Sequence, residues 1–308
     1  MHNGSALRRL WAISLSSAFW ASILFLFSAN GARGAQVCGK GVELRLSAPE
    51  STQGSLLLAE VHSATPLLQV QGEWDSRDVT FWRVGKSGTV WRALLGVDLE
   101  KAAGQYPLKI TVQTREPEAV NCTANVAVKE GHFATENLRV EKQFVEPDPE
   151  QIARAKEEGD RLHAIFDRTT PERLWRGRFR IPLDGVTTGG NFGRRRILNG
   201  EPHSPHTGVD FPAPTGTPVH AAQRGRVVLA ESLFFSGNTV IVDHGLGIYT
   251  FYGHLSAFSV KLGDLVESGT VLGKVGATGR VTGPHLHWGL TVNKARVNGL
   301  QIVKLLPD

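Results

Sequence analysis

Apolar and polar residues alternate in short runs along most of the chain after residue 37, and glycines and other turn residues separate the runs. Apolar side chains at every second position are typical of half-buried strands. Seven short segments of this kind predict a β-sandwich domain over residues 35–132: VELRLSA, SLLLAEVHS, LLQVQGEW, VTFWRVG, VWRALLGVDL, YPLKITVQT and CTANVAVKE. Trp74, Trp82 and Trp91 are interpreted as packing residues of this domain, with a carbohydrate-binding platform as the alternative.

Residues 148–175 have a helical spacing instead, inside a linker predicted for residues 133–178. Asp148 is a suitable N-cap and Pro149 suits a first helical turn. We expect this helix to pack between the two domains. Its predicted apolar stripe consists of Ile152, Ala155, Leu162, Ile165 and Phe166.

Residues 179–308 return to alternating runs that turn on glycines. This pattern predicts an antiparallel β-domain without a helix of useful length. The fold class is therefore mainly β.

The first 34 residues differ from the rest, because Arg8 and Arg9 precede a long apolar run that ends in small residues. This order is typical of a secretory signal peptide, with Ala35 as the predicted first residue after cleavage. The run approaches the length that spans a bilayer, so an uncleaved membrane anchor is the alternative. Either interpretation predicts an exported protein of the periplasm or cell envelope.

Charge and cysteine content refine this picture. The formal net charge is +5, a mild excess that does not indicate nucleic-acid binding. The chain has two cysteines, Cys38 and Cys122, and export favours a disulfide between them over lipid modification of Cys38.

Three histidine-containing motifs follow in the last domain. GPHLHWG contains His285 and His287, which share one face if the segment is a strand. HTGVD contains His206 and Asp210, which lie four residues apart and would share one face of an extended strand, and YGHL contains His254. Histidine and aspartate are both good zinc ligands.

In this order the three motifs resemble those of the lysostaphin-type (LytM-like) zinc endopeptidases, which cut peptidoglycan cross-links; the resemblance covers about residues 179–306. It implies one zinc ion per chain, held by His206, Asp210 and His287. It also implies a catalytic pair, His254 and His285, one of which acts as the general base on the zinc-bound water. The sandwich, in turn, resembles immunoglobulin-like modules that precede catalytic domains.

We therefore expect an exported zinc endopeptidase that hydrolyses the peptide stems of peptidoglycan. One alternative is a non-catalytic wall-binding regulator of another cell-wall hydrolase; another is a peptidase acting on exported proteins. The sequence does not define the oligomeric state. Among secondary candidates, Arg194–Arg196 could form a carboxylate-binding loop, Arg280 and Thr282 could contact substrate, and Asn191 is expected to form a turn. Three glycines are expected to relieve crowding at the metal: Gly208, Gly283 and Gly289. His203, His220 and His244 lie outside the motifs.

Overall fold

The computed structural model describes residues 35–306, and the fold is mainly β, which confirms the predicted class. The predicted signal peptide or anchor lies outside the described residues. Within residues 35–306 no helix combines the length and apolar character needed to cross a bilayer.

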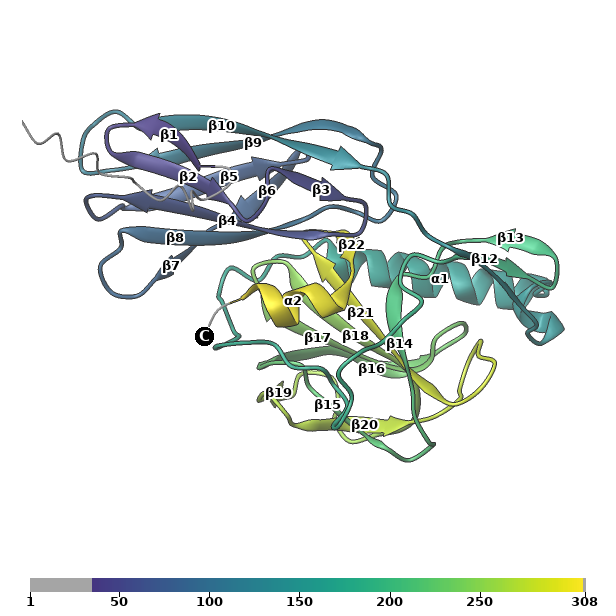
Figure 1. Ribbon diagram of the computed structural model, residues 1–308. Helices are drawn as coiled ribbons and strands as arrows, with labels where there is room; N and C mark the ends of the chain where they lie inside the picture. Colours follow the sequence, from purple (N-terminus) through teal and green to yellow (C-terminus); the bar gives the residue numbers. More distant parts are fainter. Residues whose placement is uncertain (1–34, 307–308) are drawn as a thin grey trace, which may run out of the picture. The chain divides into compact units, whose positions relative to one another are not determined.

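The first domain consists of two five-stranded sheets that lie face to face (Figure 1). It contains ten strands where the sequence pattern predicted seven, because the segment VTFWRVG is divided into two strands and two further short strands, at Ala35–Gly39 and Glu50–Thr52, lie outside the predicted segments. One sheet has the order β1-β2-β4-β8-β7 and the other β3-β10-β9-β5-β6. Their bounds are β1 (Ala35–Gly39), β2 (Val42–Leu46), β3 (Glu50–Thr52), β4 (Leu56–Ser63), β5 (Gln69–Trp74), β6 (Arg77–Thr80), β7 (Trp82–Val84), β8 (Val90–Gly96), β9 (Gly104–Gln113) and β10 (Val120–Lys129).

Alternate side chains of both sheets fill the core of this domain, as the period of two requires. Cys38 and Cys122 form the predicted disulfide, which joins β1 to β10. Trp74 is buried and its indole N–H donates to the carbonyl oxygen of Gly96. Trp82 is also buried and makes an edge-to-face contact with Trp175. These two tryptophans therefore pack within the molecule.

The segment after the sandwich contains β11 (Thr135–Leu138), the short 3-10 helix η1 (Lys142–Phe144) and α1 (Pro149–Phe166). Asp148 caps α1 in a reciprocal pair with Gln151. The helix ends at Phe166, earlier than expected, and Ile152 of the predicted stripe is 54% exposed.

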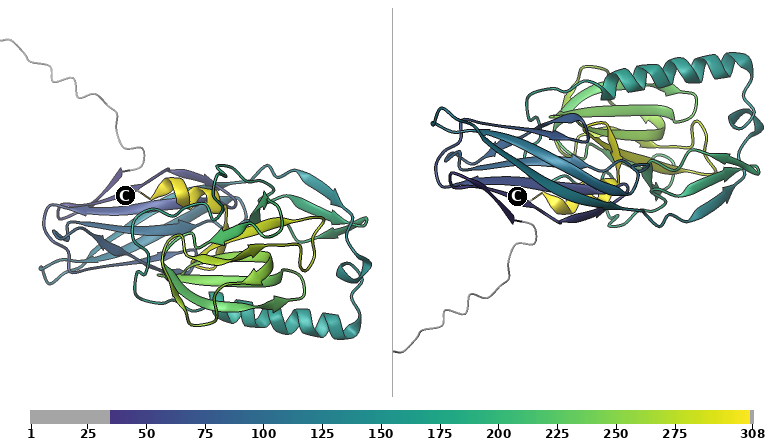
Figure 2. Two further views of the ribbon diagram at one scale, coloured as in Figure 1. Left: turned by 90° about the horizontal axis from the view of Figure 1, so that it is seen from below. Right: turned by 90° about the horizontal axis from the view of Figure 1, so that it is seen from above.

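The prediction that α1 packs between the two domains was wrong, because its apolar residues contact the last domain. Leu162, Ile165 and Phe166 pack on the sheet of the last domain, against Leu229, Leu233, Ile241 and Tyr249. Figure 2 shows the helix alongside these strands. The middle of α1 is anchored by a polar group, since the buried Glu158 accepts a hydrogen bond from the backbone N–H of Phe234.

The last domain is built on an antiparallel sheet of order β14-β21-β18-β17-β16-β19, extended by β15, β20 and β22. The strands β12 and β13 form a hairpin that precedes this sheet in sequence, and β11 pairs with β12 in parallel. The helix α2 (Gly299–Leu305) was not expected; Asn298 caps it and Ile302 is buried. The strands are β12 (Arg195–Leu198), β13 (Glu201–His203), β14 (Gly208–Pro212), β15 (Pro218–His220), β16 (Gly225–Leu233), β17 (Gly237–Gly245), β18 (Ile248–Phe258), β19 (Leu265–Val266), β20 (Val271–Val275), β21 (His285–Val292) and β22 (Ala295–Val297).

The apolar core of this sheet also contains residues of the first domain. Leu56, Leu58, Trp82 and Leu94 belong to the same buried cluster as Val292, Ala295 and Ile302. Next to this cluster Arg296 donates two side-chain hydrogen bonds to the carboxylate of Asp98, of 3.0 and 2.6 Å. The two domains therefore share a core and a polar contact.

Candidate active site

The edge strand β14 and its neighbour β21 bring two of the predicted metal ligands together. They are antiparallel neighbours, and their register places Asp210 directly opposite His287. Facing residues on antiparallel strands have side chains close enough to interact. His206 precedes β14 and lies in a loop, so it reaches the cluster from the loop and not from the strand face that its spacing suggested.

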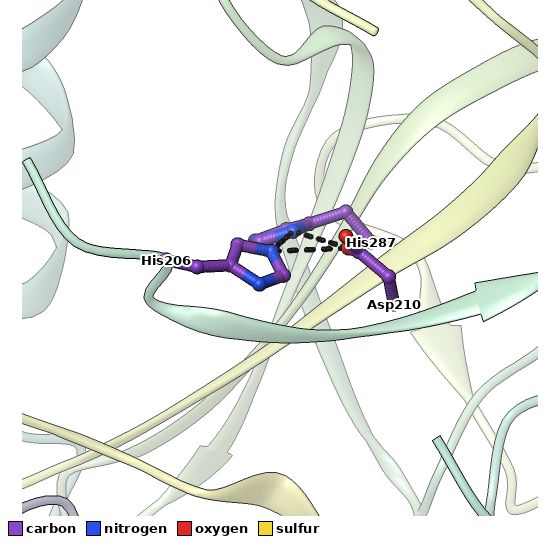
Figure 3. A group of neighbouring side chains, drawn as sticks. All are labelled: His206, Asp210 and His287. Atoms are coloured by element: carbon purple, nitrogen blue, oxygen red, sulfur yellow. Dashed lines mark hydrogen bonds and ion pairs between the residues drawn. The ribbon is translucent and has the colours of Figure 1, made fainter. Parts of the chain in front are cut away.

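Three donor atoms converge at this point (Figure 3). His206 Nε2 lies 2.8 Å from His287 Nδ1 and 3.0 Å from Asp210 Oδ1, and His287 Nδ1 lies 3.1 Å from the same oxygen. The other ring nitrogen of His206, Nδ1, donates to the carbonyl oxygen of Asn191 at 2.9 Å. That hydrogen bond places the proton on Nδ1 and directs the lone pair of Nε2 towards the cluster.

The protonation states suit a metal. Burial lowers the pKa of His287 to about 4, so its imidazole is neutral at pH 7. Burial alone would raise the pKa of Asp210, but hydrogen bonds with His206 and His287 outweigh it and hold this pKa well below its usual range. Two neutral imidazoles and one carboxylate form the kind of three-ligand set that catalytic zinc sites use. The cluster therefore fits the metal.

His254 lies beside this cluster in a constrained conformation. Its φ is 62°, in the left-handed region, where the pairing of β18 with β17 is interrupted by a bulge. Its backbone N–H donates to Ser236 and its Nδ1 to the carbonyl oxygen of Thr278, both at 2.8 Å. Burial, followed by the neighbouring His287 and His285, lowers its pKa to about 3. The ring is neutral, and its Nε2 is the unprotonated nitrogen.

His285 reaches the same place from β21. Its Nδ1 donates to the carbonyl oxygen of Gly283 at 2.8 Å, which turns Nε2 towards the cluster, where it lies 3.6 Å from Asp210 Oδ1. The ring centres of His285 and His254 are 4.8 Å apart. The spacing of two residues thus brings both imidazoles of the His-x-His segment towards Asp210.

Two cavities adjoin these side chains. The larger has a volume of about 510 Å³ and is lined by His254 and His287, with Phe235 and Phe251 among the aromatic residues. The smaller, of about 70 Å³, is lined by Asp210, His254 and His285. A peptide in the larger cavity would lie against both the metal cluster and a basic nitrogen.

The secondary candidates have different positions. Arg196 lies next to the cluster, with Nη2 4.0 Å from Asp210 Oδ2. Asn191 acts through its backbone carbonyl, which orients His206. A side chain at Gly208 would come within 2.5 Å of His287 Nε2, so the site needs a glycine here, as predicted. The same prediction was wrong for Gly283, because a Cβ at that position would meet no atom within 4 Å. At Gly289 the nearest contact would be Phe251, at 3.2 Å.

The remaining histidines lie outside the cluster. His220 contacts Gly269 and Asp184, and the buried His244 lies within β17, where its Nε2 is 2.7 Å from the hydroxyl of Thr250. The orienting contacts of Thr278, Gly283 and Asn191 with the histidines could not be predicted from the sequence, because each residue acts through its backbone carbonyl.

Comparisons with known proteins agree with this site. The model of peptidase family M23 matches residues 204–299, a range that contains all five candidate residues. The chain is 38% identical to the peptidoglycan DD-endopeptidase ShyA of Vibrio cholerae over 144 residues, 46% of this chain and 31% of that protein. It is 44% identical to the DD-carboxypeptidase/endopeptidase Mpg of Neisseria meningitidis over 103 residues, 33% of this chain and 24% of that protein. The chain thus spans about a quarter to a third of the length of these curated relatives.

A solved structure extends the likeness beyond the last domain. A crystal structure from Pseudomonas aeruginosa, described as a peptidase M23, is 30% identical to the chain and has a TM-score of 0.62. The match covers 82% of this chain and 94% of that one. Together with the matched residues 204–299, this likeness over nearly the whole solved structure shows that the chain belongs to peptidase family M23.

Proposed function

We propose that the chain is an exported zinc endopeptidase that hydrolyses peptide cross-links of bacterial peptidoglycan. The observation that carries the proposal is the convergence of His206, Asp210 and His287 beside two further histidines, each held by a hydrogen bond from Nδ1 to a backbone carbonyl oxygen. The names of the relatives ShyA and Mpg support peptidoglycan peptides as the substrate class.

His206, Asp210 and His287 would hold the zinc ion, one per chain. When bound, zinc acts as a Lewis acid that lowers the pKa of a water molecule and polarises a carbonyl group. His285 or His254 accepts the proton of the attacking water at Nε2. Once protonated at Nε2, the same histidine can donate to the developing oxyanion and return the proton to the leaving amine. The Nδ1 hydrogen bonds of His285 to Gly283 and of His254 to Thr278 leave Nε2 as the nitrogen that faces the cluster in either ring.

A diaminopimelate-type D-alanyl cross-link is the preferred bond, and the periplasm or cell envelope is the proposed location. The disulfide between Cys38 and Cys122 is consistent with an oxidising compartment. Anchoring of the exported chain through its N-terminal segment belongs to the same proposal.

Digestion of purified peptidoglycan tests the proposal. The zinc-loaded protein and its His206→Ala variant are incubated with purified cross-linked peptidoglycan. The muropeptides are then separated and identified by mass spectrometry. We expect the native protein to convert dimers into monomers and the variant to leave them intact. Unchanged cross-linking by the zinc-loaded protein would favour a wall-binding regulator, and digestion of casein without digestion of wall would favour a peptidase of exported proteins.

A further inference from the structure

Arg280 is a cation beside the active site that lacks an acidic partner. Among residues 35–306 no carboxylate forms an ion pair with its guanidinium, which lies over the ring of Phe235, 4.7 Å from the ring centre. Burial, and then the positive charge of Arg196, lower the pKa of Arg280 to about 10. A half-buried, unpaired guanidinium is costly in a folded protein unless a ligand compensates it. The position of Arg280 is therefore one that an anion would stabilise.

Arg196 adds a second cation at the same place. Both arginines line the larger and the smaller cavity, together with His254. Arg196 already binds a carboxylate, since its Nε lies 3.2 Å from Glu136 Oε1, and Glu136 also lies 3.3 Å from Arg194 Nη1. Glu136 belongs to β11, an extended segment that pairs with β12. This internal contact shows that a carboxylate carried by an extended segment can be held next to Arg196, while Arg280 has no counter-ion among the described residues.

The geometry of Arg280 is suited to recognition. Its backbone N–H donates to the carbonyl oxygen of Phe235 at 2.8 Å, and stacking on the same residue restricts the guanidinium plane. A restricted guanidinium loses little conformational entropy when it binds a carboxylate through two parallel hydrogen bonds. Lysine has no planar group with which to make that pair of contacts.

We propose that Arg280, with Arg196 beside it, forms a subsite for a carboxylate of the peptide being cleaved, and so selects acidic stem peptides. The inference rests on the proposed function, because it assigns the substrate chemistry of the same site. The larger cavity places this subsite next to His254 and His287, so a carboxylate held there fixes the peptide beside the reacting groups. Arg280 is thus a specificity-determining residue.

The test compares two cross-linked stem peptides of one sequence, one with free side-chain carboxylates and one with these groups amidated. KM and kcat are measured for the zinc-loaded full chain and its Arg280→Gln, Arg280→Lys and Arg226→Gln variants. Arg226 is the control, because it is an exposed arginine of β16 that donates to Gly263 and lines neither cavity.

We expect the wild type to prefer the free acid. Loss of a charge-assisted pair of hydrogen bonds corresponds to a change in affinity of about 10–100-fold. Arg280→Gln should therefore raise KM for the free acid by about that factor and leave KM for the amidated peptide unchanged. Arg280→Lys recovers part of the preference, and Arg226→Gln keeps all of it. Equal losses for both peptides in Arg280→Gln would show a merely structural role of the stacking on Phe235 and would overturn the proposal, as would an unchanged preference.

Failure of the proposed function has a different signature. If the wild type cleaves neither peptide, the affinity of each uncleaved peptide is measured by calorimetry for the wild type and for Arg280→Gln. Weaker binding of the acid alone in the variant supports the subsite, whereas equal affinities overturn it. If Arg280→Gln does not fold, the ratio between acid and amide in Arg280→Lys decides by the same criterion, a retained full preference being the contrary result.

Discussion

Asp210 and His287 lie directly opposite each other on the antiparallel strands β14 and β21, and Asp210 Oδ1 is 3.1 Å from His287 Nδ1. The register of the sheet therefore determines the separation of two proposed metal ligands. A carboxylate at this position balances part of the charge of a divalent ion, which the neutral imidazoles do not.

Asp210→Asn tests this relationship with a side chain of nearly the same shape. We expect zinc affinity to fall by about 100-fold or more, because an amide oxygen is a weak zinc ligand. Competition with a chromophoric chelator measures the affinity. Asp184→Asn, at an exposed carboxylate that contacts His220, is the control and should bind zinc like the wild type. Retention of tight binding by Asp210→Asn would remove Asp210 from the ligand set.

Substitution of the proposed catalytic pair, His254 and His285, should separate chemistry from metal binding. His254→Asn and His285→Asn are expected to keep one zinc per chain and to lower kcat by a factor of about 10²–10⁴, the range of general acid–base catalysis. Asparagine is chosen because it tolerates the left-handed backbone of His254 better than alanine does. Metal analysis and peptide hydrolysis are measured on the same samples. A variant that lost its zinc would belong with the ligands instead.

Gly208→Ala should weaken the metal site without removing a ligand. The added methyl group would lie 2.5 Å from His287 Nε2 and 2.8 Å from the carbonyl oxygen of Trp288, so His287 has to move. We expect zinc affinity to fall by about 10-fold or more, as when the support of a ligand is disturbed. Gly283→Ala is the matched control, since its methyl group would meet no atom within 4 Å. The same zinc titration compares the two, and equal affinities would contradict the steric argument.

The contact between Asp98 and Arg296 should make stability depend on acid pH. Burial opposes ionisation of Asp98, but hydrogen bonds from Arg296 outweigh it and hold the pKa of Asp98 below the ordinary value of 3.8. A lowered carboxyl pKa stabilises the folded state at pH values above the unfolded pKa, and this stabilisation is lost as the pH falls through the folded pKa.

We therefore expect Asp98→Asn to destabilise the protein by about 1–3 kcal/mol at pH 7, as for a broken charged hydrogen bond. The difference from the wild type should decrease below about pH 4. Urea unfolding at a series of pH values measures it, and a difference independent of pH would show that charge is not its origin.

Removal of the disulfide should lower stability without changing the site. Cys38 and Cys122 are separated by 84 positions in sequence, and a loop of that size corresponds to about 4–5 kcal/mol in the chain-entropy model. We expect a double Cys38→Ser, Cys122→Ser variant to unfold at lower urea concentration while it binds zinc normally. Loss of zinc affinity in the folded variant would contradict the separation of the two regions.

The sequence predicted more of the site than of the fold around it. His285 and His287 could be assigned to one face because a strand repeats every two residues, and the structure brings both towards Asp210. His206 joins this cluster from a loop and not from a strand face, and its ring is held there by the carbonyl oxygen of Asn191. Nothing in the side-chain pattern announces a backbone carbonyl as a partner.

Helix contacts were harder to predict from sequence. The spacing of Leu162, Ile165 and Phe166 identifies an apolar face of α1, but the identity of its partner depends on which sheet lies nearby in three dimensions. The burial of Glu158 was not predictable for the same reason, because its partner, the N–H of Phe234, is distant in sequence.

Leu56, Leu58, Trp82 and Leu94 of the first domain complete the buried cluster that contains Val292, Ala295 and Ile302. A recombinant fragment limited to residues 179–308 would expose Val292, Ala295 and Ile302 to water as an apolar surface. Such a fragment would be expected to precipitate during purification, even though every zinc ligand is present. The β-sandwich thus supplies part of the apolar core of the last domain, and a protein expressed for study should retain it.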